Sequence, residues 1–278
     1  MLTVLSLSPA VIFMQTKYFR YSADRLPVFL FLALSVLDFL LYFIVDNWLV
    51  LIPYILLVLP VKGAVSAFTH HHQHHKTFRS PVLNHILEFF YFLHTGATSN
   101  MWVLQHNLGH HINYKEPLKD EARWMTNNGQ TMSALKYTVF NTLTIYGHVF
   151  HIGKRHPKLL KSVVYHHVIG LLLLATLLYY QPINALLLFL VPMLLIFIFT
   201  VFATYDHHAE LDTGTPLHAS RNNLNKLHNI MHGNLGYHTA HHLRPGLHWS
   251  KLPEFHETIK DQIPDELIHD SYFDWRQS

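Results

Sequence analysis

Four long apolar stretches constrain the fold of this chain more strongly than any other feature of its sequence. Each approaches the about 20 consecutive apolar residues that an α-helix needs to cross the hydrocarbon core of a bilayer. Because a backbone in lipid must satisfy its own hydrogen bonds, such stretches are expected to be helical. The sequence therefore predicts an all-α integral membrane protein with four transmembrane helices. We place the spans at residues 26–45, 48–67, 162–180 and 183–205.

The links within the two pairs of spans are very short, covering only residues 46–47 and 181–182. Each pair is therefore expected to form a hairpin. Both chain ends and the region between the hairpins then lie on one side of the membrane. We expect residues 68–161 and 206–278 to form a helical cap on that side, so that residues 1–278 make a single domain.

The basic residues indicate which side this is. All 20 Lys and Arg residues are expected on the cap side, because the two links contain none. By the positive-inside rule that side is cytoplasmic, which predicts a multi-pass protein of a bacterial inner membrane or an endoplasmic reticulum membrane. Lys62 lies near the end of the second span, where its ammonium group is expected to reach the interface. Asp38, inside the first span, is expected to face protein or water.

Three segments outside the spans also carry a signal. Leu2–Met14 is apolar but short and lacks preceding basic residues, so we expect it to lie in the membrane interface. Met132–Phe150 is apolar in patches and predicts an amphipathic surface helix. A helical stretch is expected to run from about Asn222 into a histidine-rich motif that begins at Gly236.

Histidine is the anomalous residue of this composition, with 26 copies and no cysteine in the chain. Three clusters share one pattern. The helical offsets i, i+3 and i+4 place the histidines of the last cluster on one helix face. With no thiolate available and few acidic residues, the clusters predict a metal site built almost wholly from imidazole, which suits iron, copper or zinc. The clusters are His70-x3-His74-His75, His106-x3-His110-His111 and His238-x2-His241-His242.

The number of histidines indicates more than one metal ion. Eight or more candidate ligands exceed the coordination of a single ion and predict two metals held between helices. His208 lies where the fourth span leaves the membrane and can add a ligand at the same level. The neighbouring Asp206 is a candidate for orienting an imidazole through its other ring nitrogen. The sequence assigns no role to His207, His228 or His232.

Other classes of function fit less well. A His-rich metal transporter or sensor is the main non-enzyme alternative, but transporters place polar ligands near the membrane midplane, and these spans contain almost none. The formal net charge of +3 comes without a concentrated basic run, so a nucleic-acid partner is not expected. The positions of the clusters, just outside the spans, favour an enzyme.

Together the motifs resemble the membrane fatty acid desaturase and hydroxylase superfamily, which includes alkane ω-hydroxylases and terminal-olefin-forming decarboxylases. The resemblance covers roughly Phe68 to Pro245 and includes the closing motif Gly-Tyr-His-x2-His-His-x2-Pro. The family has an isolated histidine after its fourth span, which His208 matches here, and often an Asn four residues before it. This chain has Thr204 at that position. We call the three clusters box one (His70 to His75), box two (His106 to His111) and box three (His238 to His242). Box one fits the family in two registers that differ by about 100° around a helix. By position the resemblance implies metal ligands among His70 with His74 or His71 with His75, and His106, His110, His111, His208, His238, His241 and His242.

The resemblance also implies a chemistry. Two iron ions and O2 would desaturate, or hydroxylate, an unactivated C–H position of a fatty acyl chain. Terminal-olefin formation from a fatty acid and alkane hydroxylation remain alternatives within the superfamily. The chain has no cysteine to hold an iron–sulfur cluster, and the part after Pro245 is too short for a cytochrome b5-like domain. We therefore expect a separate electron donor of the ferredoxin, rubredoxin or cytochrome b5 type.

Overall fold

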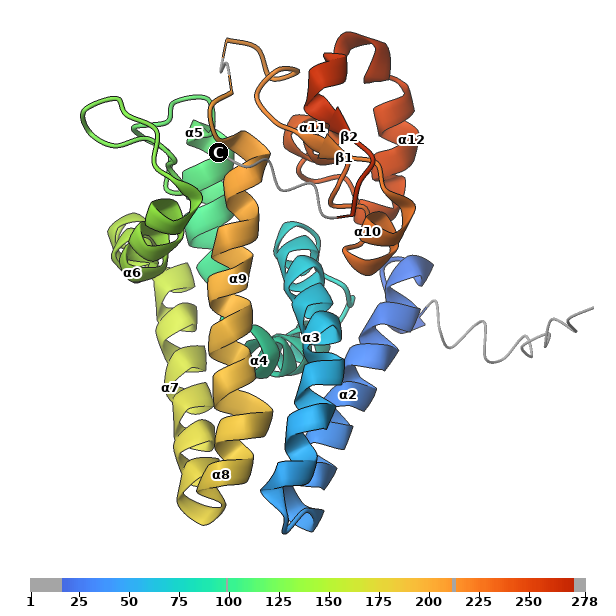
Figure 1. Ribbon diagram of the computed structural model, residues 1–278, viewed down its shortest axis with the longest axis vertical. Coiled ribbons are helices and arrows are strands. Elements are labelled where there is room, and N and C mark those ends of the chain that lie inside the picture. The colour runs from blue at the N-terminus through green and yellow to red at the C-terminus, as the bar shows by residue number, and fades with distance from the viewer. Residues whose placement is uncertain (1–16, 99, 212–213, 273–278) are drawn as a thin grey trace, which may run out of the picture.

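The computed structural model describes residues 17–98, 100–211 and 214–272, and its regular secondary structure is almost entirely helical (Figure 1). Leu2–Met14, predicted to lie in the interface, is outside the described residues. The α-helices are α2 (Arg25–Ile44), α3 (Leu51–His74), α4 (Pro81–Thr95), α5 (His111–Asn113), α6 (Ala134–Gly153), α7 (Pro157–Tyr180), α8 (Pro182–Ala185), α9 (Val191–His208), α10 (Lys226–Met231), α11 (His238–Leu243) and α12 (Leu252–Glu257).

Shorter elements complete the chain. Two short strands, β1 (Asn222–Asn223) and β2 (Ile268–His269), pair in parallel within the cap. Two segments have the wider turns of a π-helix, η3 (Val103–His110) and η4 (Leu186–Leu190). The remaining elements are single 3-10 turns, η1 (Ser22–Asp24), η2 (Trp48–Val50), η5 (Trp249–Lys251), η6 (Lys260–Gln262) and η7 (Asp265–Leu267).

Four of the helical segments are long and apolar enough to cross a membrane, which confirms the predicted all-α architecture. They cover Ser22–Ile44, Trp48–His74, Pro157–Tyr180 and Pro182–His208. Each contains the matching predicted span, apart from a difference of one residue at the end of the first. At the cap end α3 and α9 extend several residues beyond the predicted bounds, so that helices from both hairpins carry histidines out of the apolar region.

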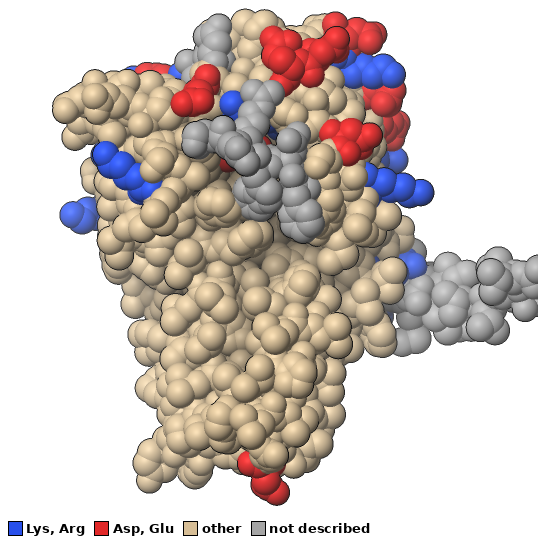
Figure 2. Space-filling view, in the orientation of Figure 1, with Lys and Arg blue, Asp and Glu red and all other residues tan. Residues whose placement is uncertain are grey.

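Charged side chains gather over the cap in Figure 2, whereas the surface below it is almost free of them except at the far tip. The two hairpins are held together at that tip. Tyr42, in the first hairpin, donates a hydrogen bond to the Leu177 carbonyl oxygen of the second at 2.8 Å. The Asn184 side chain donates to the backbone carbonyls of Tyr42 and Val45 at 3.1 and 2.8 Å. These bonds fix the spacing of the spans beneath the cap.

Two helices run across the spans instead of along them. In Figure 1, α4 and α6 are seen nearly end-on beside α9. α4 packs against α3 and α9, and α6 packs against α9 and η3. The predicted amphipathic helix corresponds to α6, whose buried Tyr137 and Ile145 alternate with the exposed Leu135 and Leu143.

The position of Lys62 differs from the prediction. Its ammonium group does not reach the interface but is fully buried inside the bundle, 2.5 Å from the Asp38 carboxylate. Asp38 also accepts a hydrogen bond from the Tyr54 hydroxyl at 2.8 Å, and Lys62 reaches the Leu188 carbonyl at 3.3 Å. Leu188 lies in η4, where the widened turns leave room for such a contact. A charge within a span is costly in lipid unless it is paired, and here both charges satisfy each other.

The expected continuous helix from Asn222 into the last histidine motif is also wrong. The chain instead forms β1, then α10, and turns before α11 begins. Gly233 and Asn234 both adopt positive φ angles, 58° and 60°, and this left-handed geometry ends a helix. Gly236 then packs so closely that a Cβ atom there would lie 2.0 Å from the Asn223 carbonyl oxygen.

Candidate metal centre

Histidines from all three sequence clusters converge at the cap end of α3 and α9 into two groups. In the first group, one side-chain nitrogen of each residue lies within 4.8 Å of the corresponding nitrogens of the others. The Nε2 atoms of His70 and His106 are 2.8 Å apart, and those of His111 and His241 are 3.0 Å apart. The members of the first group are His70, His74, His106, His111 and His241.

The second group contains four histidines and lies beside the first. His110, His208 and His242 meet the same criterion of mutual distance. His238 joins them, because its Nε2 atom is 3.1 Å from the Nε2 atoms of both His208 and His242. The two groups share elements, since box two and box three each contribute to both.

The backbone explains how the three boxes reach one centre with different spacings. In α3 and α11 the offsets of three and four residues lie on one helix face. Box two has offsets of four and five residues, which an α-helix would spread over different faces. His106 and His110 lie in η3, and His111 follows as the first residue of α5. The His111 amide donates to the carbonyl of His106, five residues earlier. This wider turn brings the two ends of the box back to the same side, and π-helical turns occur frequently at functional sites.

Two imidazoles of the second group are oriented through their Nδ1 atoms. His110 Nδ1 lies 2.9 Å from both carboxylate oxygens of Asp120, a buried residue. His208 Nδ1 lies 2.7 Å from the backbone oxygen of Ala219. A carboxylate and a carbonyl only accept hydrogen bonds, so both Nδ1 atoms carry the proton and both Nε2 atoms present a lone pair. Asp206, the candidate named from the sequence for such a role, is 3.6 Å from Arg221.

The electrostatics of the groups fit a bound cation. Burial, and then the neighbouring imidazoles, hold the pKa of His106, His241 and His242 well below the usual value for histidine, so these rings are neutral. The two lone pairs of His110 and His208 face each other across 3.2 Å, which is repulsive with nothing positive between them. Two nitrogens that are each about 2.0–2.1 Å from one metal ion at a right angle would be about 3 Å apart.

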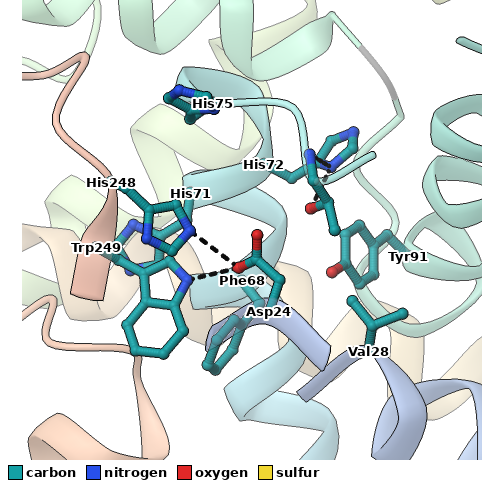
Figure 3. A pocket seen from close by; sticks show the side chains of 10 residues that line it. Asp24, Val28, Phe68, His71, His72, His75, Tyr91, His248 and Trp249 are labelled. Atoms are coloured by element: carbon teal, nitrogen blue, oxygen red, sulfur yellow. Dashed lines mark hydrogen bonds and ion pairs between the residues drawn. The ribbon is translucent and has the colours of Figure 1, made fainter. Parts of the chain in front are cut away.

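The alternative register of box one lies away from both groups. His71 Nε2 is 3.3 Å from the His232 backbone oxygen. The rings of His71 and His75 instead line a separate pocket with the N-terminal end of α2 and the segment after α11 (Figure 3). In that pocket Asp24 accepts a hydrogen bond from the Trp249 indole at 2.8 Å and lies 3.1 Å from His248. These contacts join the first span to the cap.

The remaining histidines without a predicted role lie around the centre. His207 packs its ring on His238, with centroids 3.9 Å apart. His228 and His232 lie on or next to α10 and pack on each other, with centroids 4.5 Å apart. Asp120 was missed by sequence reasoning because it lies in the loop after box two, ten residues from its imidazole, where no periodic spacing marks it.

The comparisons with known proteins agree with this architecture. The model of a family described as fatty acid desaturase matches residues 46–273, which is most of the chain and includes every histidine of both groups. The chain belongs to the fatty acid desaturase family. Membership implies an oxidoreductase of membrane lipid metabolism that acts on fatty acyl chains. Comparison with curated proteins and with solved structures found no match.

A cavity adjoins the histidine groups of this desaturase family member, between η3, α6 and α9. Histidines of both groups reach it, and most of its other walls are apolar or carry hydroxyl and amide groups. The Tyr137 hydroxyl and Thr204 Oγ1 are 2.9 Å apart there. The lining residues are Trp102, Gln105, His106, His110, Ala122, Tyr137, Asn141, Ile145, Val201, Thr204, His207, His208 and His238.

Proposed function

We propose that this protein is a membrane di-iron oxidoreductase that uses O2 to desaturate, or hydroxylate, an unactivated C–H position of a fatty acyl chain. The observation that carries the proposal is the convergence of nine imidazoles into groups of five and four beside one partly apolar cavity. Family membership supports the acyl substrate. The position of the histidines outside the middle of the spans argues against a transport path for metal.

We assign the metal ligands to the two groups. The first iron would be held by the five histidines of the first group, and the second by His110, His208, His238 and His242. Box one then binds metal through His70 and His74, whereas His71 and His75 line the neighbouring pocket. The fit rests on the neutral rings, on the lone pairs that face each other, and on nitrogen separations that suit a shared ion.

Two irons at these positions would supply the oxygen-activating chemistry that removal of hydrogen from an unactivated carbon requires. The protein's residues supply position and orientation. Asp120 and the Ala219 carbonyl keep the lone pairs of His110 and His208 directed inward. Trp102, Ile145 and Val201 give the cavity apolar walls against which a methylene chain can lie. A chain held there passes next to histidines of both groups.

The electrons are proposed to come from a separate protein, because the sequence has no cysteine to ligate a cluster. A ferredoxin, rubredoxin or cytochrome b5 type donor fits this need. The basic residues of the cap support a cytoplasmic site by the positive-inside rule. Turnover by the purified chain with no redox protein added would contradict the need for a donor.

The test is the metal content of the detergent-purified protein, with Mössbauer spectra of iron-57 material, followed by turnover of acyl substrates with a redox donor. We expect about two irons per chain in a nitrogen-rich environment and an O2-dependent product. His74→Ala should remove iron, whereas His75→Ala, the matched variant in the other register, should retain it. Zinc in place of iron, or iron loss from both variants alike, would overturn the assignment.

A further inference from the structure

A third cluster of metal-binding side chains lies away from the nine histidines, between α4 and α7. His85 and Glu88 lie one turn apart on α4, and His166 comes from α7. One ligand atom of each lies within 4.8 Å of the other two. The two imidazole rings stack at 5.2 Å with an angle of 29° between their planes. Two imidazoles and a carboxylate are a ligand set that zinc favours.

The carboxylate of this cluster is buried, and its two oxygens are used differently. Glu88 Oε1 lies 3.0 Å from His72 Nε2 and 2.6 Å from the Lys76 ammonium group. Glu88 Oε2 has a different neighbour, His85 Nδ1, at 3.1 Å. The hydrogen bond from His72 and the charge of Lys76 hold the pKa of Glu88 below its usual value despite its burial, so the carboxylate is ionised. One oxygen is thus anchored, and the other faces the two imidazoles.

The imidazole on α7 is already in the state that metal binding needs. His166 Nδ1 lies 2.7 Å from the backbone oxygen of Ser162, one turn earlier. Because a carbonyl oxygen only accepts, the proton is on Nδ1 and the lone pair is on Nε2. A backbone carbonyl that fixes the tautomer in this way is a regular feature of metal-binding histidines. The His85 side chain is 57% exposed and can rotate to present a nitrogen to the same point.

We propose that His85, Glu88 and His166 form a separate zinc site that bridges α4 and α7, with water as the fourth ligand. Its effect would reach the metal centre through Glu88 and His72, because His72 lies on α3 between His70 and His74. Zinc bound to Glu88 would draw negative charge away from Oε1 and weaken its hydrogen bond with His72. The weaker hydrogen bond would let α3 shift. Occupancy of the site is therefore expected to lower turnover without displacing iron.

Lys76 provides a sharp way to test the site. Its ammonium group lies 2.6 Å from Glu88 and repels any cation bound to the same carboxylate. The side chain is one-third exposed, so it can turn to the solvent when a cation binds. Replacing it with a neutral residue should tighten zinc binding by about tenfold, since a like charge a few ångströms away is removed. A merely structural histidine pair would show no such effect.

The experiment is a titration of the iron-loaded, detergent-purified protein with Zn²⁺, with zinc and iron per chain measured by elemental analysis after removal of free metal. Wild type should bind one more zinc per chain than His85→Ala or His166→Ala, with iron unchanged in all three. Lys76→Gln should bind the same zinc about tenfold more tightly. His151→Ala, at an exposed histidine of α6, is the matched control and should bind zinc as wild type does.

Activity measured in the same titration separates this proposal from the proposed function. Without zinc, His85→Ala and His166→Ala should turn over as wild type does, and zinc should inhibit wild type but not these variants. Equal zinc content in wild type and the two variants would overturn the site, as would unchanged affinity in Lys76→Gln. Either result would leave the nine-histidine centre untouched, because iron content reports on that centre independently.

Discussion

Replacement of Asp120 should remove one iron and not both. Asp120 is 3% exposed, and each of its oxygens lies 2.9 Å from His110 Nδ1. One oxygen also accepts a hydrogen bond from the Ala122 amide at 2.8 Å. In Asp120→Asn the carbonyl oxygen of the new side chain would remain with the Ala122 amide, and its NH2 group would face His110. The imidazole would then accept at Nδ1 and carry its proton on Nε2, the atom that should bind metal.

The size of the effect follows from the role of such partners. Loss of a group that orients a ligating histidine lowers metal affinity by about 10–100-fold, or about 1.4–2.7 kcal/mol. Asp120→Asn should lie at the upper end, because the amide favours the wrong tautomer. Asp120→Ala should lie lower, since water can replace the lost carboxylate. His110 belongs to the second group alone, so the five histidines of the first group should keep their iron.

The assay is iron content after dialysis against a series of chelator concentrations at one pH. Wild type should keep both irons at concentrations where Asp120→Asn keeps one. Glu116→Gln is the matched control, because this exposed carboxylate of the same loop pairs only with Lys119 in the described residues. Wild-type retention of both irons by Asp120→Asn would refute the reasoning about the tautomer. Loss of both irons together would refute the division into two groups.

Three further predictions concern stability and metal content. Gly236→Ala should cost about 1–3 kcal/mol of stability or more, because the new Cβ atom would lie 2.0 Å from the Asn223 carbonyl oxygen. The melting temperature in detergent should fall accordingly, and an unchanged melting temperature would contradict the close packing. Lys62→Met should cost about 3–5 kcal/mol of stability, measured by denaturant unfolding, because it leaves the Asp38 charge unpaired. Adding Asp38→Asn should recover part of that loss. No recovery would show that the two residues are not energetically coupled. His241→Ala should lower iron content and abolish turnover, and near wild-type activity would exclude it as a ligand.

Much of the fold was predictable because its signals are local. Length and apolarity give the four spans, and the two-residue links give the hairpins. The burial of Lys62 beside Asp38 could not be predicted from local signals of this kind. A lysine near the end of a span is equally compatible with the interface and with a buried partner, and the choice depends on Asp38 of another helix. The turn at Gly233 and Asn234 was missed because the pattern of histidines on both sides continues through it.

The histidine groups show the same limit at finer scale. Spacing predicts which residues share a helix face, but in box one two registers satisfy it equally. Only the packing of α3 distinguishes them, since one face meets η3 and the other meets the segment that contains His248 and Trp249. Asp120 has no spacing signal at all. A contact made by a loop across ten residues depends on the path of the loop, which the sequence does not encode as a period.

The histidines that reach the two groups have different offsets in the three boxes, and the backbone of each box accounts for its offsets. In α3, two histidines four residues apart lie on one face of an α-helix and reach the same group. In the short helix α11, offsets of three and four residues bring histidines to both groups. Box two must also serve both groups, but its adjacent pair, His110 and His111, separates between them. An α-helix would turn His111 away from His106 by more than a right angle. The π-helical turns of η3 reduce that angle, so that His106 and His111 both reach the first group. Box one has the same Hx3HH spacing on the α-helix α3 and brings only His70 and His74 to the centre, so the spacing alone does not predict the π-helix.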